Sequence, residues 1–324
     1  MFVIFITLFH RYIGPFRKDH GMKTAHRLLL LVLTGLLGGH PVSAKIYRLY
    51  YLGGQSNMDG YGRNAELPRE LSGIQSDVMI FHGNTLPDDT TLGGQGVWAP
   101  LRPGHGVYFS SDGTDNTYSD RFGVELSFAK KLKALRPEES IAIIKYCRGG
   151  TSIAIEAARN FGCWDPDFRD KNGINQYDHF LATVRNAMSI SDIDHDGETD
   201  ILVPAGIIWM QGESDAAWTD STALKYVDNL KRLMDLVRAA FRSDDLPVVI
   251  GRISDSGHAT TGRVWKHGDI VRMAQHDFVS GDACAALIIS TDEYDYSDPW
   301  HYNTDGYIDL GNRFAESMAF LLNQ

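Results

Sequence analysis

The clearest indication of the fold comes from residues 203–242, which read VPAGIIWMQGESDAAWTDSTALKYVDNLKRLMDLVRAAFR. Residues 203–210 form an apolar run of strand length, typical of a strand buried on both faces. In residues 221–242 apolar side chains recur every three or four positions, which places them on one face of a helix: Val227, Leu230, Met234, Val237 and Phe241. A buried strand followed by an amphipathic helix predicts a helix packed on a sheet.

The same alternation continues through most of the chain. Further strands are predicted at residues 46–52, 141–147, 247–253 and 285–290, with one more indicated at 78–81. Helical patterns lie at residues 122–135, 176–188, 264–278 and 305–322. Strands and helices in series predict an α/β fold, with a parallel sheet of about five strands covered by helices on both faces.

Composition narrows the class of protein. The chain has 324 residues, of which 43% are hydrophobic and 22% charged, values typical of a globular protein. Its 31 Lys and Arg against 41 Asp and Glu give a net charge of −10, so we expect no nucleic-acid partner. Three cysteines are too few for a disulfide scaffold, and we predict free, buried thiols: Cys147, Cys163 and Cys284.

The amino-terminal residues 1–44 have the pattern of a targeting segment. Residues 22–44 start with Lys23 and Arg27, continue with an apolar run and end in small residues before Lys45. This pattern predicts a signal peptide that starts at Met22 and is cleaved after Ala44, leaving a single domain at residues 45–324. A membrane anchor is the alternative, but the apolar run is about half of the roughly 20 residues needed. We expect a secreted or periplasmic protein with no stable membrane association.

Ligands of open α/β sheets bind beyond the carboxyl ends of the strands, so the residues that follow each strand deserve inspection. The first strand leads into Gly-Gly-Gln-Ser-Asn-Met at residues 53–58, where Ser56 is a candidate nucleophile. A serine hydroxyl needs a base within hydrogen-bond reach to react at neutral pH. A helix N-cap is the alternative role for this serine. The pattern is not Gly-x-Ser-x-Gly, which argues against an α/β-hydrolase nucleophile turn.

Two further strand ends carry groups suited to binding an oxyanion. Residues 148–152 read RGGTS, where glycines allow backbone N–H groups to approach a ligand, although a plain turn would look the same. Residues 209–215 read WMQGESD, where the amide of Gln211 can donate to an oxyanion. Glu213 and Asp215 can instead compensate the dipole of the next helix, which we expect for Asp215.

The last strand leads into residues 292–302, DEYDYSDPWHY, in which Asp298 and His301 are three positions apart. On a turn, this spacing brings a carboxylate to an imidazole, holds one tautomer and stabilises the imidazolium that forms when histidine accepts a proton. His301 is therefore the candidate base for Ser56. A solvated loop histidine is the alternative.

These blocks, GGQSNM, RGGTS, WMQGESD and DPWHYNTDGY, each follow a strand, and together they resemble the SGNH (GDSL-like) hydrolase superfamily. The closest resemblance is to carbohydrate esterase family six and the sialate O-acetylesterase-like branch. It implies a three-layer α/β/α sandwich of the flavodoxin-like kind, with Ser56 as nucleophile and Asp298 and His301 as its partners. The implied oxyanion donors are the Ser56 backbone N–H, Gly149 or Gly150, and Gln211. Asn57 and Glu213 are implied as supporting residues.

The resemblance implies an exported serine esterase that removes O-acetyl groups from a carbohydrate, of the acetylxylan or sialic acid type, through an acetyl-enzyme. No cofactor is implied, and the expected partner is the acetylated carbohydrate. Two alternatives stay open: an inactive carbohydrate-binding relative, and a short-chain lipase or thioesterase of the same superfamily. On the substrate side we expect Trp300, which can stack on a sugar, and Arg148, which can bind a carboxylate.

An acidic loop has the start of an EF-hand calcium pattern, with oxygen-bearing side chains at alternating positions and glycine sixth: Asp192, Asp194, Asp196, Glu198 and Asp200. The twelfth position is Val203 instead of the bidentate Glu. A structural Ca²⁺ site completed by other oxygens and a solvated acidic turn both fit this pattern.

Overall fold

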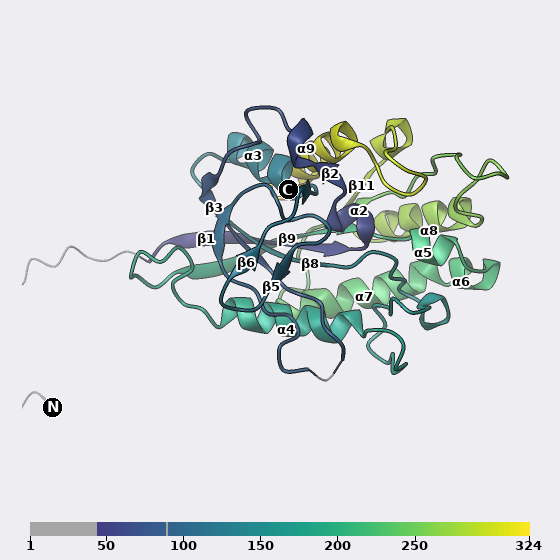
Figure 1. The fold of residues 1–324 in the computed structure, drawn as a ribbon, viewed down its shortest axis with the longest axis horizontal. Coiled ribbons are helices and arrows are strands. Elements are labelled where there is room, and N and C mark those ends of the chain that lie inside the picture. The colour runs from purple at the N-terminus through teal and green to yellow at the C-terminus, as the bar shows by residue number, and fades with distance from the viewer. Residues whose placement is uncertain (1–43, 89) are drawn as a thin grey trace, which may run out of the picture. The chain divides into compact units, whose positions relative to one another are not determined.

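The computed structural model describes residues 44–88 and 90–324, so the predicted signal segment lies outside the described residues except for Ala44. Seven strands form one sheet in the order β11-β10-β9-β1-β8-β3-β4 (Figure 1). Neighbouring strands are parallel apart from β4, which runs antiparallel to β3. The strands are β1 Ile46–Gly54, β3 Gln75–His82, β4 Ala99–Leu101, β8 Ser140–Cys147, β9 Ile201–Met210, β10 Val248–Gly251 and β11 Ala285–Ile288.

The predicted α/β class and parallel sheet are confirmed. The five strands predicted with most support give the order β8-β1-β9-β10-β11, which is the flavodoxin-like order 2-1-3-4-5. The indicated strand at 78–81 is β3, which extends this sheet beyond β8. The sequence did not predict β4, a short edge strand that contains Pro100, a residue tolerated at sheet edges.

Helices cover both faces of the sheet. Figure 1 shows α3 (Glu125–Leu135) and α9 (Thr304–Leu321) on one side, and α4 (Gln176–Met188) and α7 (Tyr226–Ala240) on the other. Helix α8 (Gly268–Ser280) packs beside α7. Successive side chains of a strand point to opposite faces of the sheet, so β1 contacts the helices on both faces.

Two adjacent tyrosines of β1 show this anchoring directly. The Tyr50 ring packs edge-on against Phe128 of α3, with centroids 5.5 Å apart. The Tyr51 ring packs on Phe180 of α4 at 4.8 Å and on Phe241, which follows α7, at 5.9 Å. All five rings are buried, so β1 forms the centre of the hydrophobic core.

Several predicted boundaries differ from the structure. The helix expected at residues 221–242 is two helices, α6 (Asp220–Leu224) and α7, which meet at Lys225. Helix α3 starts later than expected because Arg121–Phe122 forms strand β7, paired with β2 (Gly62–Arg63). Strand β11 is at the sheet edge, so its first three residues are half-buried rather than buried on both faces.

The remaining elements are short. They are α2 Ser56–Asp59, η1 Asn64–Glu66, β5 Ser110–Ser111, β6 Asn116–Thr117, η2 Ile155–Ala157, α5 Glu213–Ala216 and η3 Ser290–Glu293. Within the described part of the chain, no helix combines the length and apolar character that crossing a membrane requires.

The sheet topology fixes where a ligand can bind. Strand β1 lies between β8 and β9, and the connections through α3 and α4 cover opposite faces of the sheet. The strand order therefore reverses at β1, and open α/β sheets bind their ligands in the crevice that forms at such a point. Ser56 directly follows β1 and stands at this position.

Candidate active site

The turn after β1 holds Ser56 at the mouth of a cavity. Gly54 has φ +144°, and a Cβ atom at this position would lie 2.0 Å from the Met210 carbonyl oxygen at the end of β9. The next N–H, of Gln55, donates to the same oxygen at 2.9 Å. Gln55 occupies the N-cap position of α2 and Ser56 is its first residue, so Ser56 is not the helix cap. The turn therefore leaves the Ser56 hydroxyl available for chemistry.

Asp298 and His301 form the expected carboxylate–imidazole pair. Asp298 Oδ1 accepts the backbone N–H groups of Trp300 at 2.8 Å and His301 at 2.9 Å. Asp298 Oδ2 lies 2.7 Å from His301 Nδ1. This bond holds the imidazole in the tautomer with its proton on Nδ1, which leaves Nε2 free to accept a proton.

The electrostatics of this pair suit a general base. Burial lowers the pKa of His301 below its usual value, and this effect outweighs the opposing influence of Asp298. Burial alone would raise the pKa of Asp298, but hydrogen bonds from His301 and the Trp300 backbone bring it below its usual value. At neutral pH the pair is therefore a carboxylate beside a neutral imidazole, the state that accepts a proton from serine.

Ser56 and His301 line the same cavity, which has a volume of about 880 Å³. No hydrogen bond joins the two side chains in the described residues, and such contacts commonly tighten when substrate binds. Tyr61 also lines the cavity, and its ring stacks on the imidazole with centroids 3.5 Å apart and an interplanar angle of 5°. No sequence motif marks Tyr61, and the sequence analysis did not find it.

The glycine pair after β8 lies beside Ser56, the candidate nucleophile. A Cβ atom on Gly149 would lie 3.3 Å from the Ser56 Cβ, and Gly150 has φ +78°, a conformation that favours glycine. Within the described chain, the backbone N–H groups of both glycines donate to no carbonyl oxygen of the protein. Together with the Ser56 N–H, these groups can form the predicted oxyanion hole.

Gln211 is not where the sequence analysis expected it. Its side chain is fully buried and does not line the cavity. Its Nε2 donates to Asp215 Oδ2 at 2.7 Å and to the Thr151 carbonyl at 3.2 Å, and its Oε1 accepts from Tyr226. With both ends of the amide engaged, Gln211 joins loops behind the site and does not face a substrate carbonyl.

Asp215 lies in the first turn of α5, the position expected for a carboxylate that compensates the helix dipole, and it has a second role that was not predicted. Its carboxylate accepts the backbone N–H groups of Ile153 and Ala154, each at 3.0 Å. Burial raises the pKa of Asp215 to about 6, against the influence of these hydrogen bonds. This carboxylate therefore fixes the loop after β8, which carries the glycine pair, to helix α5.

Asn57 follows Ser56 in α2 and links this helix to the segment that carries His301. Its Nδ2 donates to Glu213 Oε1 at 2.7 Å and to the Trp300 carbonyl at 3.1 Å. Its Oδ1 accepts from the Tyr307 hydroxyl at 2.8 Å. Burial raises the pKa of Glu213 to about 7, with the Asn57 hydrogen bond opposing the rise. The two predicted supporting residues thus form one buried bridge between α2, α5 and the His301 segment.

Two groups of described residues place possible metal ligands close together. Carboxylate, imidazole and thiol atoms of Asp59, His82 and Cys147 lie within 4.8 Å of one another at the edge of the cavity. The buried ammonium of Lys145 lies beside this group and donates to the Asp59 carbonyl at 2.8 Å and to Glu125 at 2.8 Å. The serine mechanism derived below uses none of these ligands.

The second group is in the predicted calcium loop, where carboxylate oxygens of Asp192, Asp194 and Asp200 lie within 4.8 Å of one another. Lys45 Nζ donates to Asp194 Oδ2 at 2.7 Å, so an ammonium already neutralises one of these carboxylates. Asp196 and Glu198 are exposed and lie outside this group. Calcium binding in this loop stays a prediction. The three cysteines are free, as predicted, although Cys284 is half-buried rather than buried.

The cavity also holds the predicted substrate-side residues. Trp300 is 50% exposed, and it lines the cavity together with Arg148. A second arginine, Arg159, joins them there and was not predicted. Neither guanidinium forms an ion pair with a carboxylate in the described residues. Two arginines without an ion-pair partner among the described residues therefore line the cavity that also contains Ser56.

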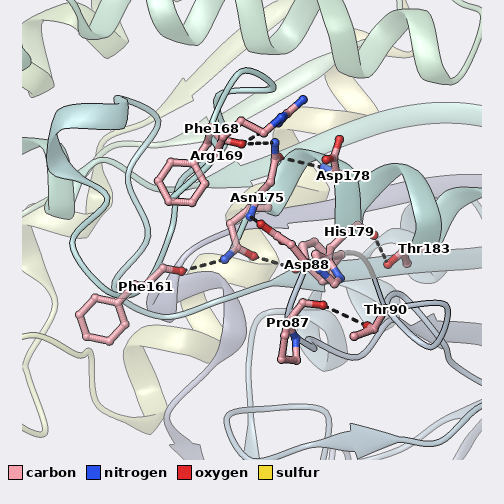
Figure 2. Close-up of polar contacts among 12 residues, drawn as sticks. Pro87, Asp88, Thr90, Phe161, Phe168, Arg169, Asn175, Asp178, His179 and Thr183 are labelled. Atoms are coloured by element: carbon pink, nitrogen blue, oxygen red, sulfur yellow. Dashed lines mark hydrogen bonds and ion pairs between the residues drawn. The ribbon is translucent and has the colours of Figure 1, made fainter. Parts of the chain in front are cut away.

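Hydrogen bonds at the amino-terminal end of α4 hold two loops that neighbour the cavity (Figure 2). Asp88, in the loop after β3, accepts the N–H of Asn175 at 2.9 Å and lies 3.5 Å from His179 Nε2. Asn175 Nδ2 donates to the carbonyls of Pro166 at 3.1 Å and Phe168 at 3.3 Å. Both loops are therefore tied to the amino-terminal end of α4, which holds their shape without substrate.

Comparisons of structure agree with this fold. A protein from Arabidopsis thaliana superposes with a TM-score of 0.57 at 19% identity, covering 84% of this chain and 97% of the other. A carbohydrate acetylesterase from Xanthomonas citri gives 0.58 at 20% identity, over 85% of this chain and 56% of the other. NanS superposes with a TM-score of 0.56 at 14% identity, covering 87% of this chain and 99% of the other.

Comparisons of sequence give the family. No curated protein matches the chain. The family model described as "Carbohydrate esterase, sialic acid-specific acetylesterase" matches residues 46–320, nearly the whole described chain, and confirms the resemblance carried by the four sequence blocks. The chain therefore belongs to this family of carbohydrate esterases and is a carboxylic ester hydrolase.

Proposed function

We propose that the protein removes O-acetyl groups from an acidic sugar of the sialic acid type. The observation that carries this proposal is the pair Arg148 and Arg159, which line the cavity of Ser56 without a carboxylate partner among the described residues. A guanidinium binds a carboxylate through two parallel hydrogen bonds, which also orients the substrate. A neutral acetylated sugar, such as a xylose unit, would leave both arginines unused.

The proposed reaction has two halves. His301 Nε2 takes the proton from Ser56, and Oγ attacks the acetyl carbonyl; the N–H groups of Ser56, Gly149 and Gly150 stabilise the oxyanion. The imidazolium then protonates the sugar oxygen, and the C–O bond breaks to give acetyl-Ser56 and the free sugar hydroxyl. In the second half His301 deprotonates a water molecule, whose oxygen attacks the acetyl carbonyl. The imidazolium then returns the proton to Ser56 Oγ as the bond between Oγ and the acetyl carbon breaks, which releases acetate and restores Ser56.

The test compares the wild-type chain with Ser56→Ala on three esters: 4-nitrophenyl acetate, O-acetylated sialic acid and acetylated xylan. We expect acetate release from the first two, loss of both activities in Ser56→Ala, and a higher kcat/KM on the acidic sugar than on xylan. Replacing Arg148 with Gln should raise KM for the acidic sugar and leave 4-nitrophenyl acetate hydrolysis nearly unchanged. Preference for xylan would contradict the acidic-sugar assignment.

The two alternative functions make different forecasts. A short-chain lipase or thioesterase would keep its activity as the acyl chain of a 4-nitrophenyl ester lengthens, whereas an acetylesterase loses activity beyond the shortest chains. An inactive binding relative would release no acetate from any of the three esters while still binding the sugar.

Export and independence of a cofactor are part of the proposal. The pattern of residues 22–44 supports cleavage after Ala44, so amino-terminal sequencing of the protein recovered outside the cytoplasm should begin at Lys45. Each chemical step above uses side chains and backbone of this chain, so esterase activity should survive exhaustive dialysis against EDTA.

A further inference from the structure

A second groove of about 730 Å³ opens next to the catalytic cavity. Arg159 lines both, so the two hollows share one wall. We name this feature the distal groove and define it by Ile155, Arg159, Phe168, Arg169, Lys171 and Trp218. Its volume falls within the range of about 300–1,000 Å³ that small-molecule sites occupy. None of the residues that perform the proposed reaction lines it.

Most of the charges in the distal groove that lack an ion-pair partner are positive. Arg159, Arg169 and Lys171 are exposed, and within the described residues none of the three forms an ion pair. Arg169 is held in place because its Nη1 donates to the carbonyls of Phe168 at 2.6 Å and Pro166 at 2.9 Å (Figure 2). Three cations without counterions stand out on a chain of net charge −10.

Of the two carboxylates of this groove, Glu156 has a cation partner and Asp170 keeps its negative charge. Glu156 Oε1 lies 3.0 Å from Lys225 Nζ, so its charge is compensated by a residue outside the groove. Asp170 Oδ1 accepts the backbone N–H of Asn172 at 2.9 Å within its own turn. A ligand that enters the distal groove therefore meets more uncompensated positive than negative charge.

The groove also presents apolar surface. Trp218 and Ile155 are each 44% exposed, so both present apolar surface to the groove. Below them Ala158, Cys163 and Phe168 form a small buried cluster separate from the main core, which supports the groove floor. The C–H face of a sugar ring packs well on an indole, while cations beside the indole bind carboxylates.

We propose that the distal groove binds the sugar next to the acetylated one, and that the preferred substrate is an acidic oligosaccharide or polysaccharide rather than a free acetylated monosaccharide. This inference rests on the proposed function, which places the cleavable ester in the cavity beside the distal groove. It adds a separate binding site made of Trp218, Arg169 and Lys171. Arg159 stands at the shared wall, where it can contact the carboxylate of either sugar.

The test compares an acetylated acidic monosaccharide with an acetylated oligosaccharide of the same sugar. Trp218→Ala and Lys171→Gln should each raise KM for the oligosaccharide, Trp218→Ala by about tenfold, and leave the kinetics of the monosaccharide and of 4-nitrophenyl acetate unchanged. Phe320→Ala is the matched control, because Phe320 is 66% exposed on α9 and lines neither hollow. An equal effect on both sugars, or none on either, would overturn the proposal.

A binding measurement separates this proposal from the proposed function. Calorimetric titration of the wild-type chain with the deacetylated acidic oligosaccharide needs no catalysis. Binding that Trp218→Ala weakens, and that a neutral oligosaccharide of equal length does not reproduce, supports the distal groove even if no acetylated sugar is hydrolysed. Absence of binding, or binding that Trp218→Ala leaves unchanged, contradicts it even if the esterase activity is found.

Discussion

The His301 imidazole gives a pH dependence of activity with a definite sign. Burial lowers its pKa below the ordinary value of about 6.5, so the neutral base persists into mildly acidic solution. We expect kcat/KM for 4-nitrophenyl acetate to stay level near neutral pH and to fall when His301 becomes protonated, with its midpoint below pH 6.5. A midpoint above 6.5 would contradict the burial of this imidazole.

Tyr61 is the second residue whose role can be tested individually, because its ring covers one face of the same imidazole. Tyr61→Ala should admit water to His301, lower kcat and move the acidic midpoint up toward 6.5. Tyr61→Phe keeps the stacked ring and should behave like the wild type. If Tyr61 serves only to fold the loop, the alanine variant will lose stability in thermal unfolding while its pH midpoint stays in place.

At the scale of the structural elements, the conformation of the turn from β1 to α2 requires glycine at position 54. Any side chain there would adopt an unfavourable positive φ and collide with the Met210 carbonyl of β9. Gly54→Ala should therefore destabilise the fold by at least about 2 kcal/mol, measured by denaturant unfolding. The control is Gly73→Ala, where an added Cβ meets no atom within 4 Å. Equal stability of the two variants would contradict the tight contact between β1 and β9.

The bridge between α2, α5 and the His301 segment makes a prediction at the same scale. Glu213→Gln keeps an oxygen that accepts from Asn57, whereas Glu213→Ala leaves Asn57 without this partner. We expect the alanine variant to lose more kcat than the glutamine variant, because Asn57 also binds the Trp300 carbonyl next to the base. Equal loss in both would indicate that the carboxylate itself, and not the bridge, matters.

Glu213 also links stability to pH, and the sign follows from its raised pKa. The carboxyl group of Glu213 has a pKa of about 7 in the folded state and about 4.5 in the unfolded state. The folded state therefore binds a proton more tightly, and the stabilisation this gives at low pH is lost as the pH rises between these two values. The loss amounts to at most about 3 kcal/mol. Glu213→Gln has no carboxyl group at this position, so its stability does not fall in this way. The difference between its free energy of unfolding and that of the wild type should therefore increase from pH 4.5 to pH 8, as urea titrations can measure.

At the scale of the whole molecule, the residues that sequence reasoning placed correctly share one property. Ser56, Gly149 and His301 come from segments that follow parallel strands, and parallel strands bring their carboxyl ends to one edge whatever the loops do. Gln211 also follows a strand, but Gly212 has φ +142° and the side chain before this turn faces inward. Residue type and spacing do not reveal that direction.

Tyr61 and Arg159 escaped the sequence analysis for a different physical reason. Tyr61 lies in the short connection between α2 and β2, whose path depends on the pairing of β2 with the distant β7. Arg159 lies in the long segment between β8 and α4, whose path also depends on contacts between distant residues. The bond between Asp88 and Asn175, which holds a loop that neighbours the cavity to α4, is such a contact. No local pattern encodes a pairing of this kind, so the strands and the position of Ser56, Asp298 and His301 at one sheet edge were predictable and the shape of the cavity was not.

One apolar core joins all parts of the described sheet and predicts how residues 45–324 unfold. A single cluster of buried side chains includes Phe128 of α3, Phe180 of α4, Ile288 of β11 and Phe314 of α9, so helices on both faces pack on the same strands. No element can lose its packing without exposing its neighbours, and we expect one cooperative transition. Differential scanning calorimetry should give a calorimetric enthalpy equal to the van't Hoff enthalpy, with loss of esterase activity at the same temperature. Two resolved transitions, or activity lost well before the main one, would show that the catalytic loops form a separate unit that does not depend on this core.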